Sequence, residues 1–254
     1  MKANRNYLNL IYELSWLDFK LKYYGSVLGI LWSLIKPFMM LGILYVVFFY
    51  FLKVGIPDYQ VYLLLGIVIW NFFADATIDS TNNMAAKANL LQKTNLPPFA
   101  VIVSSVIQSF WTFAITLGIF FIFFLVLGFH FTWSAIVIPL LVLFLALLVF
   151  GVALAIAPLY MRFRDFRHIW EIFLQMLFWI TPIVYQYTNV PEKYLRWYLL
   201  NPVARIVIDA RNALLYNHFP EAKQLLITAA IVVAVCAAGI AIFKKYSRTF
   251  VEQL

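Results

Sequence analysis

The fold is decided by TNLPPFAVIVSSVIQSFWTFAITLGIFFIFFLVLGFHFTWSAIVIPLLVLFLALLVFGVALAIAPLYM, residues 94–161, a run of 68 residues without a single Asp, Glu, Lys or Arg. A helix needs about 20 mainly apolar residues to cross the hydrocarbon core of a bilayer, so this run is long enough for two crossings. Its more polar stretch, Gly-Phe-His-Phe-Thr at 128–132, supplies the turn between them. The run therefore predicts two antiparallel transmembrane helices.

The composition of the whole chain agrees with this prediction. Of the 254 residues, 65% are hydrophobic and 12% are charged, and the mean hydropathy is +0.89. An average soluble domain carries about 25% charged residues, and a domain of this size leaves much of its surface in water. A soluble enzyme, a nucleic-acid-binding domain and a disordered chain are excluded. We expect an all-α integral membrane protein, with 1–254 as a single transmembrane domain.

Four further charge-poor runs flank the central pair and bring the expected number of transmembrane helices to six. They are residues 37–52, 59–74, 172–191 and 224–243. With six crossings both termini lie on one side, where we count thirteen of the nineteen Lys and Arg residues. Because cytoplasmic loops carry the excess of Lys and Arg, we expect both termini in the cytoplasm and the chain in the cell's inner membrane.

Two other segments have helical patterns but do not suit a crossing. Residues 4–22 place Tyr7, Leu10, Ile11, Leu14, Leu17 and Leu21 on one face and charges elsewhere, as in an amphipathic helix that lies in the membrane interface. Residues 191–220 are too charged and too short for two crossings. They predict two short helices, separated at Asn201-Pro202, in a re-entrant or surface hairpin on the external side.

The polar connection NNMAAKANLLQKTNLPP, residues 82–98, predicts a cytoplasmic helix over 84–96 that ends before Pro97-Pro98. Exposed Leu90, Leu91 and Leu96 among polar neighbours would suit insertion into a groove of a partner protein. The pattern fits an ordinary loop helix equally well, so the residues alone leave both interpretations open.

Few residues in the chain suit catalysis or ligand chemistry. No Gly-rich phosphate loop is present, the chain has one cysteine, and the three histidines fall at different membrane levels. We therefore expect no nucleotide, disulfide or metal site. Asp75 and Asp79 are four residues apart on one helix and would suit an ion or proton relay. We favour the alternative that both lie near the cytoplasmic end, in water or paired with a neighbouring helix.

Four stretches resemble the permease subunits of ABC-2 type polysaccharide exporters, most closely those that export O-antigen; teichoic-acid and capsule exporters are similar. The stretches are SVLGILWSLIKPF (26–38), NLLQKTNLPP (89–98), LFWITPIVY (177–185) and NPVARIVIDARNALL (201–215). The resemblance implies six transmembrane helices, an N-terminal interface helix, a cytoplasmic coupling helix between helices 2 and 3, and periplasmic gate helices before helix 6. It also implies a homodimer that works with two copies of a separate ATPase subunit. ATP and magnesium would bind to that partner, and no cofactor to this chain.

The resemblance gives each segment an expected role in exporting a lipid-linked polysaccharide. The coupling residues would be Asn89, Leu90, Leu91, Gln92, Lys93, Thr94, Asn95 and Leu96, and the gate residues Trp197, Tyr198, Asn201, Pro202, Arg205 and Arg211. Lys20, Lys22 and Lys36 would receive the diphosphate headgroup of the lipid carrier, although the same lysines would also serve as ordinary positive-inside anchors. Tyr45 and Phe49, four residues apart, would offer stacking contacts to sugar rings along the pathway.

Two other functions remain as alternatives. A secondary transporter would need ion sites near the midplane, typically at broken helices in paired halves, and we find no internal repeat. A membrane-embedded enzyme that modifies glycans or lipids would need acids or histidines gathered in one cavity. Asp209, Arg211 and His218 are the external candidates for such a site.

Overall fold

The computed structural model describes residues 2–93, 96–163 and 165–253, and every regular element in these ranges is helical. The α-helices are α1 (Lys2–Tyr23), α2 (Trp32–Tyr45), α3 (Tyr59–Ala86), α4 (Ala88–Lys93), α5 (Pro98–Val126), α6 (Ile138–Arg162), α7 (Phe166–Ile180), α8 (Glu192–Tyr198), α9 (Pro202–Leu214) and α10 (Ala222–Gln253). Short 3-10 or π turns extend several of them: η1 (Gly29–Leu31), η2 (Val46–Phe51), η3 (Trp133–Val137) and η4 (Tyr187–Asn189).

Five helical segments of the described residues are long and apolar enough to cross a membrane. They are Gly29–Phe51, Tyr59–Ala86, Pro98–Val126, Trp133–Arg162 and Ala222–Tyr246. The expected all-α membrane class is thus confirmed. The charge-free run holds two of these segments, and the break between them lies at 128–132, as predicted.

The span expected at 172–191 differs from the structure. Helix α7 has 15 residues and ends at Ile180, so at about 1.5 Å per residue it reaches roughly 22 Å, less than the hydrocarbon thickness of ~30 Å. Thr181 at its C-cap has an extended backbone, and Pro182 follows. Because proline carries no N–H and disfavours a helical conformation in the residue before it, the helix stops partway along the bundle.

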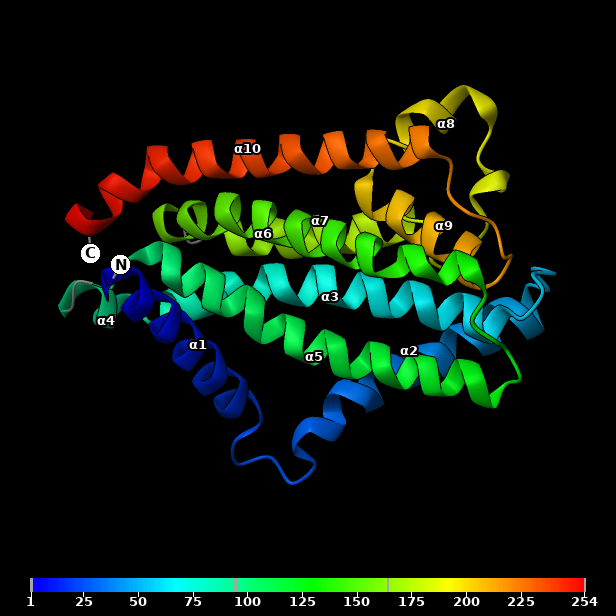
Figure 1. Cartoon of the computed structure of the whole chain (residues 1–254), viewed down its shortest axis with the longest axis horizontal. Helices are drawn as coiled ribbons and strands as arrows, with labels where there is room; N and C mark the ends of the chain where they lie inside the picture. The colour runs from blue at the N-terminus through cyan, green and yellow to red at the C-terminus, as the bar shows by residue number, and fades with distance from the viewer. Residues whose placement is uncertain (1, 94–95, 164, 254) are drawn as a thin grey trace.

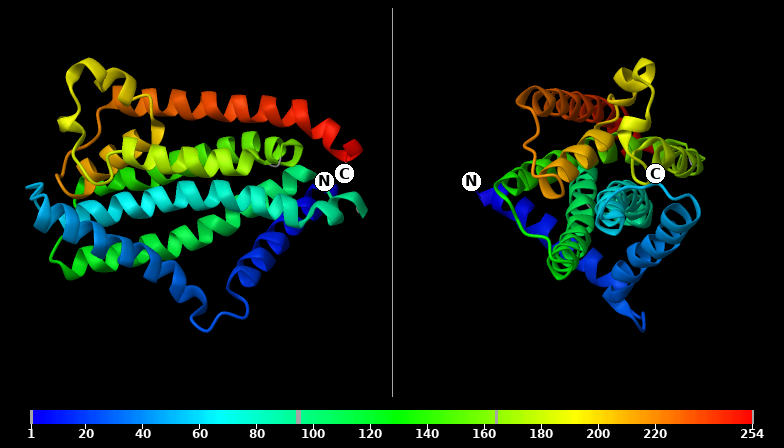
Figure 2. Two further views of the ribbon diagram at one scale, coloured as in Figure 1. Left: turned by 180° about the vertical axis from the view of Figure 1, so that it is seen from behind. Right: turned by 90° about the vertical axis from the view of Figure 1, so that its right-hand side faces the viewer.

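Helix α3 forms the centre of the bundle. Most of its residues from Tyr59 to Met84 are buried, and it packs against α2, α5, α6, α7 and α9. Figure 1 shows both termini and α4 at one end of the bundle, with α8 and α9 at the opposite end. Figure 2 shows α10 beside α6, on the side of the bundle away from α1 and α2.

Glycines bring α6 and α10 into close contact. A Cβ atom at Gly239 would lie 2.1 Å from the carbonyl oxygen of Gly151, and one at Gly151 would lie 2.9 Å from the backbone of Cys236. Small residues allow membrane helices to approach until their backbones touch, which replaces the missing hydrophobic driving force with close packing. Here they fix the last helix of the chain against α6.

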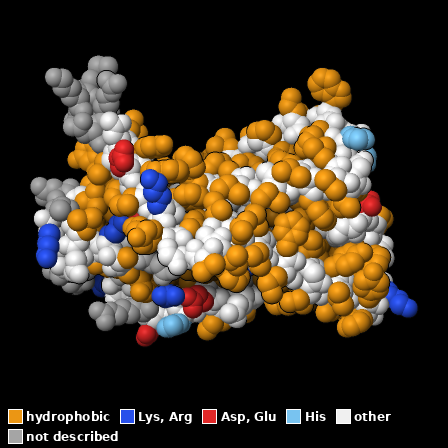
Figure 3. All heavy atoms as spheres, turned by 90° about the horizontal axis from the view of Figure 1, so that it is seen from below, with side chains coloured by type: hydrophobic (Ala, Val, Ile, Leu, Met, Phe, Trp, Pro, Cys, Tyr) orange, Lys and Arg blue, Asp and Glu red, His pale blue; other side chains and the backbone are white. Residues whose placement is uncertain are grey.

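The N-terminal helix lies obliquely to the bundle and packs against α5. Trp16 and Phe19 contact Trp111 of α5, with ring centroids 5.5 and 6.3 Å apart. Leu17 and Leu21, on the predicted apolar face, remain exposed. Figure 3 shows that apolar side chains cover the middle of one face of the molecule, whereas most of its visible Lys and Arg side chains lie toward the end with the termini. This distribution suits a surface in contact with lipid.

The expected helix over 84–96 is wrong. The structure instead has the last turn of α3, which ends at Ala86, and the separate six-residue helix α4. The side chains of Leu91 and Leu96 pack against the buried core, whereas Leu90 is exposed. The chain turns at Lys87, where φ and ψ are −96° and 7°, so the helix cannot continue in one direction.

Candidate functional site

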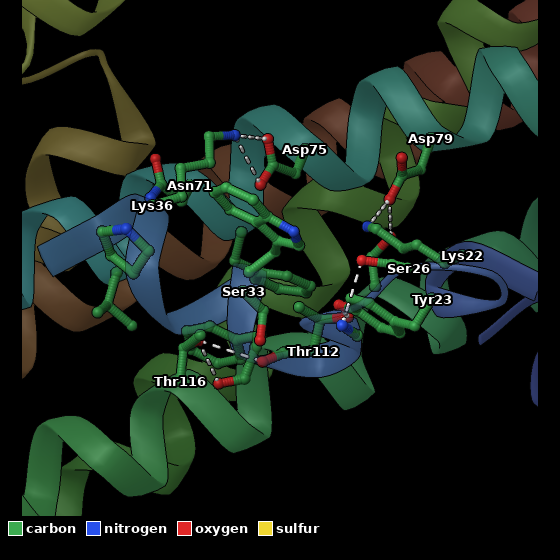
Figure 4. Close-up of a pocket in the computed structure, with 17 residues that line it drawn as sticks. Lys22, Tyr23, Ser26, Ser33, Lys36, Asn71, Asp75, Asp79, Thr112 and Thr116 are labelled. Atoms are coloured by element: carbon green, nitrogen blue, oxygen red, sulfur yellow. Dashed lines mark hydrogen bonds and ion pairs between the residues drawn. The ribbon is translucent and has the colours of Figure 1, made fainter. Parts of the chain in front are cut away.

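A cavity of about 330 Å³, lined by apolar side chains and by several charged and hydroxyl-bearing ones, lies between α1, α2, α3 and α5. Trp32 and Lys36, which line it, are exposed, so the cavity opens on the outer surface of the bundle. Helix α3 contributes Asn71, Asp75 and Asp79, which follow one another at intervals of four residues and therefore share a helix face. Hydroxyl groups from α5 line the wall opposite, among them Thr112 and Thr116 (Figure 4).

Two ion pairs cross this cavity. The Lys22 ammonium of α1 lies 2.7 Å from Oδ2 of Asp79, and the Lys36 ammonium of α2 lies 3.0 Å from Oδ1 of Asp75 (Figure 4). The hydroxyl of Ser109 also donates to Oδ2 of Asp79, at 3.0 Å. The two aspartates are thus paired with neighbouring helices, as we favoured, and an ion or proton relay has no support in this geometry.

Lys22 remains charged in this setting. Burial lowers the pKa of its ammonium group, but the charge of Asp79 and the hydrogen bond to it act in the opposite direction, and the net pKa is raised above 10.5. Lys20, which we grouped with these lysines, does not line the cavity. Its ammonium lies 5.1 Å from the ring centroid of Trp16. The cavity therefore brings together Lys22 and Lys36 but not Lys20.

A third ion pair, which sequence reasoning missed, ties α1 to the end of α3. The ammonium of Lys87 contacts Oδ2 of Asp18, and both side chains are largely buried. Asp18 and Lys22 are four residues apart, so they share one face of α1. Lys87 immediately precedes α4. Helix α1 therefore connects the cavity with the segment that we expected to couple to a partner. The charged residues on α1 were the sequence feature from which this ion pair could have been predicted.

Of the coupling residues, Asn89, Leu90, Gln92 and Lys93 lie on α4 and are exposed. Leu91 and Leu96 are partly buried against the core. Thr94 and Asn95 lie outside the described residues. We expected Leu90, Leu91 and Leu96 all to be exposed. Because only Leu90 of these three is exposed, the exposed surface of this segment is more polar than we expected.

The aromatic residues expected along the pathway form one stack. The rings of Tyr45 and Phe49 are 4.8 Å apart and nearly parallel, and both face Tyr59 of α3, with centroids 6.1 and 6.5 Å away. Phe49 is 38% exposed. The π turn over Val46–Phe51 also places Tyr50 edge-on against both rings. The stack thus presents an aromatic surface at the end of the bundle that holds α8 and α9.

At that end, residues 191–220 differ in burial along their length. Helix α8 is mostly exposed, including Trp197, and the hydroxyl of Tyr198 reaches that of Tyr185 at 3.3 Å. Helix α9, by contrast, is buried along most of its length. Asn201 caps it by accepting from the N–H groups of Val203 and Ala204, and Pro202 occupies its first turn. This segment therefore consists of a short exposed helix, α8, followed by a buried helix, α9.

Arg211 anchors α9 inside the bundle. The residue is 2% exposed, and its guanidinium donates to the carbonyl oxygens of Tyr62, Pro182 and Ile183. The ring of Tyr62 lies 3.4 Å from the guanidinium carbon. Pro182 and Ile183 follow the end of α7, where the helical ladder no longer satisfies the backbone. Because unsatisfied carbonyls are costly inside a membrane protein, Arg211 supplies the donors that the shortened α7 lacks.

Arg205 and Asp209 lie on the same helix. Arg205 donates to the carbonyl of Leu199 and to Oε1 of Gln224, which ties α9 to the start of α10. Burial raises the pKa of Asp209 to about 6, an effect that Arg205 partly offsets. Within the described residues, Oδ2 of Asp209 is buried without a hydrogen-bond partner. Arg205 therefore holds α9 against the start of α10.

Taken together, the apolar helices and the cavity at the side of their bundle define a polytopic, all-α membrane protein. The model of the ABC-2 type transporter family matches residues 9–215. The chain therefore belongs to the ABC-2 type transporter family, which confirms the resemblance noted in the sequence.

Relatives match along nearly the full length of the chain. It is similar to the O-antigen export system permease protein RfbA of Klebsiella pneumoniae, with 29% identity over 261 aligned positions that cover 100% of this chain and 98% of the relative. The protein of the same name from Myxococcus xanthus is 24% identical, with 98% and 96% covered. The polysialic acid transport protein KpsM of Escherichia coli is 22% identical, with 85% of each chain covered. The chain is thus a transport subunit and not a membrane-embedded enzyme, and the secondary-transporter alternative has no support among these relatives.

Proposed function

We propose that this chain is the transmembrane subunit of an exporter that moves a lipid-linked polysaccharide, of the O-antigen class, across the inner membrane. The observation that carries the proposal is the lateral cavity with the ammonium groups of Lys22 and Lys36 inside it. Phosphate pairs favourably with such groups when it is partly shielded from water. The names of relatives that match over the full length support the substrate class.

The position of the cavity suits a lipid substrate. It opens on the outer surface of the bundle beside Trp32 and Lys36 of α2, so a polyprenyl tail could remain in the bilayer while its headgroup lies between the helices. Hydroxyl groups of Thr112 and Thr116 then face the first sugar. In this arrangement Lys20, on the exposed part of α1, serves as a positive anchor at the membrane surface.

Six crossings with both termini in the cytoplasm remain our proposed topology. Helix α7 and the segment after it would form the fifth crossing in chain order, with α9 filling the space beyond the end of α7, and α10 would be the sixth. The two termini lie at one end of the bundle (Figure 1), which supports an even number of crossings. A reporter fused after Leu254 should be active only in the cytoplasm and one inserted near Asn189 only outside; the opposite pair of results would overturn this topology.

Export by this chain requires partners. We propose a homodimer with two copies of an ATPase subunit that bind ATP and magnesium, whereas this chain binds no cofactor of its own. The ATPase would contact α4 and the exposed residues Asn89, Leu90 and Lys93. Leu90→Asp should abolish copurification of the ATPase subunit, because a charge buried without a partner costs several kcal/mol. Phe219→Asp, an exposed apolar residue at the opposite end of the bundle, is the matched control.

Beyond the cavity, the polymer would pass along the dimer interface toward α8. The aromatic stack of Tyr45 and Phe49 would supply sequential contacts to sugar rings, each worth about 1 kcal/mol and so weak enough to release. The exposed helix α8, with Trp197 and Tyr198, would form the movable part of the external gate. Arg205 and Arg211 would hold the fixed part, α9, and Asn201-Pro202 would be the hinge.

Charge removal at the cavity tests the proposal. In cells that lack the native gene, Lys22→Gln/Lys36→Gln should be expressed in the membrane at the normal level but should leave the lipid-linked polymer on the cytoplasmic side. Lys244→Gln, at an exposed lysine on α10, is the matched control and should export normally. Surface polymer is measured by gel electrophoresis of whole-cell extracts. Normal export by the double variant would overturn the assignment of the cavity.

A further inference from the structure

Four consecutive backbone carbonyls, those of residues 182–185, lie just beyond the end of α7 and are all held by side chains of other helices. Arg211 of α9 donates to the first two. The hydroxyl of Tyr59 in α3 donates to the third at 2.8 Å, and the hydroxyl of Tyr62 donates to the fourth at 2.7 Å. These two distances are usual for a hydroxyl donor. Residues 182–185, the carbonyl frame, are therefore fixed to α3 and α9, although they form no helix.

The side chain of Tyr185, the last residue of the carbonyl frame, is fixed as well. Its hydroxyl donates to the carbonyls of Trp179 and Ile180, each at 3.0 Å. Both carbonyls belong to the last turn of α7, where no further helical N–H group is available to them. The hydroxyl oxygen of Tyr185 therefore has a fixed position, and it can still accept a hydrogen bond.

Helix α8 is attached to the bundle more loosely than the carbonyl frame. Its half-buried residues are Leu195 and Tyr198, which are three residues apart and so share one face, whereas its other residues are exposed. The hydroxyl of Tyr198 donates to that of Tyr185 at 3.3 Å, longer than the usual distance of about 2.7–2.8 Å. Among the side-chain hydrogen bonds and ion pairs of the described residues, this bond alone joins α8 to the rest of the bundle.

The segment that contains α8 is anchored at both ends. On one side it follows the carbonyl frame. On the other side it leads into Asn201, which caps α9 and donates to the hydroxyl of Thr181 at 3.0 Å. Because Thr181 directly precedes the frame, the two anchors lie close together. Surface loops with adjacent ends are a recurring functional element, and residues 186–200 can swing as a unit while α7 and α9 stay in place.

We propose that the hydrogen bond between Tyr198 and Tyr185 is the latch of the external gate, and that the carbonyl frame positions it. This inference rests on the proposed role of α8 as the movable part of that gate. A latch needs one side that stays in place and one contact weak enough to break. Four side-chain bonds hold the frame, whereas the latch is a single, long, uncharged bond. Opening of α8 therefore breaks the weakest contact and leaves the frame intact.

The expected effect of removing the latch follows from the strength of one such bond. Tyr198→Phe removes the donor and keeps the aromatic ring. Loss of one uncharged hydrogen bond of this length should raise the open population of α8 about two- to fivefold. Tyr59→Phe/Tyr62→Phe, which releases half of the frame, should also raise the open population, and in addition it should lower the unfolding temperature.

Labelling of a cysteine on the half-buried face of α8 measures the open population. Cys236→Ala removes the chain's one native thiol, and Leu195→Cys in that background supplies the probe. Cells depleted of ATP are treated with a maleimide that does not cross the inner membrane. When opening and closing are fast relative to labelling, the labelling rate follows the open population. Tyr198→Phe should be labelled about two- to fivefold faster than the background protein. Tyr194→Phe, at an exposed tyrosine of the same helix, is the matched control and should keep the background rate.

The outcomes separate the latch from the gate. Labelling of Tyr198→Phe at the background rate would overturn the latch, and the gate would stand if restored ATP still speeds labelling of the background protein. Labelling of the background protein that does not rise with ATP, in cells that export the polymer, would overturn both. Tyr198→Phe should unfold at the background temperature, so faster labelling with a lowered unfolding temperature would show a general loss of stability and would also overturn the latch.

Discussion

Replacing Gly66 by alanine tests how α9 is fixed to the centre of the bundle. A Cβ atom at this position would lie 2.5 Å from Nη2 of Arg211 and 3.3 Å from a methyl group of Ile183. Non-bonded heavy atoms prefer separations of about 3.5–4.0 Å, so the guanidinium must move by roughly 1 Å. Its hydrogen bonds to Tyr62 and Ile183, now 2.9 Å from Nη2, would lengthen beyond the normal range.

The expected cost follows from the number of bonds at risk. A hydrogen bond to a charged group contributes about 1.5–3 kcal/mol, and measured values in membrane proteins are lower, near 0.6 kcal/mol. With two such bonds weakened, we expect Gly66→Ala to lower the free energy of unfolding by about 2 kcal/mol. Arg211→Lys should have a similar effect, because one ammonium cannot reproduce the planar fork that reaches three carbonyls.

Thermal unfolding in mild detergent provides the measurement. Gly118→Ala in α5 is the matched control, because a Cβ atom there meets nothing within 4 Å and alanine favours the helix by roughly 1 kcal/mol. We expect Gly66→Ala to unfold several degrees below the wild type and Gly118→Ala at or above it. Equal unfolding temperatures for the two variants would refute the conclusion that Gly66 makes room for Arg211.

Three further predictions address other parts of the molecule. Asp18→Asn should lower the free energy of unfolding by about 3 kcal/mol, because it leaves the buried Lys87 ammonium without its partner. In a double-mutant cycle measured by denaturation, Asp18→Asn/Lys87→Met should recover most of that loss. If the losses of the two single variants simply add in the double variant, the two residues are not paired. Because the pKa of Asp209 is raised to about 6, its contribution to stability falls as pH rises from about 4 to 6. Asp209→Asn should therefore raise the melting temperature at pH 7.5 and not at pH 4, and an equal change at both values would exclude burial as the cause. Tyr45→Ala/Phe49→Ala should lower the amount of surface polymer while membrane expression stays normal, whereas unchanged export would remove both rings from the pathway.

The membrane class and most of the crossings could be predicted from the sequence. Charge-free runs locate the long spans because the hydrocarbon core does not tolerate unpaired charges, and that constraint acts on each segment separately. Asn201-Pro202 likewise marks the break before α9, because proline and an N-capping side chain determine where a helix begins regardless of its neighbours. The family resemblance also lies in contiguous motifs, such as residues 201–215, which can be read without knowledge of the fold.

Only the tertiary structure decided which charged groups meet. Lys22 and Asp79 are 57 residues apart, and Arg211 and Tyr62 are 149 apart. No local pattern specifies such pairs, since they depend on how each helix is rotated and where it crosses its neighbours. For the same reason the sequence left two roles possible for Asp75 and Asp79, and it did not show whether α9 is buried. Hydrophobic periodicity predicts which side of a helix is buried, whereas the packed bundle decides which residues cover that side.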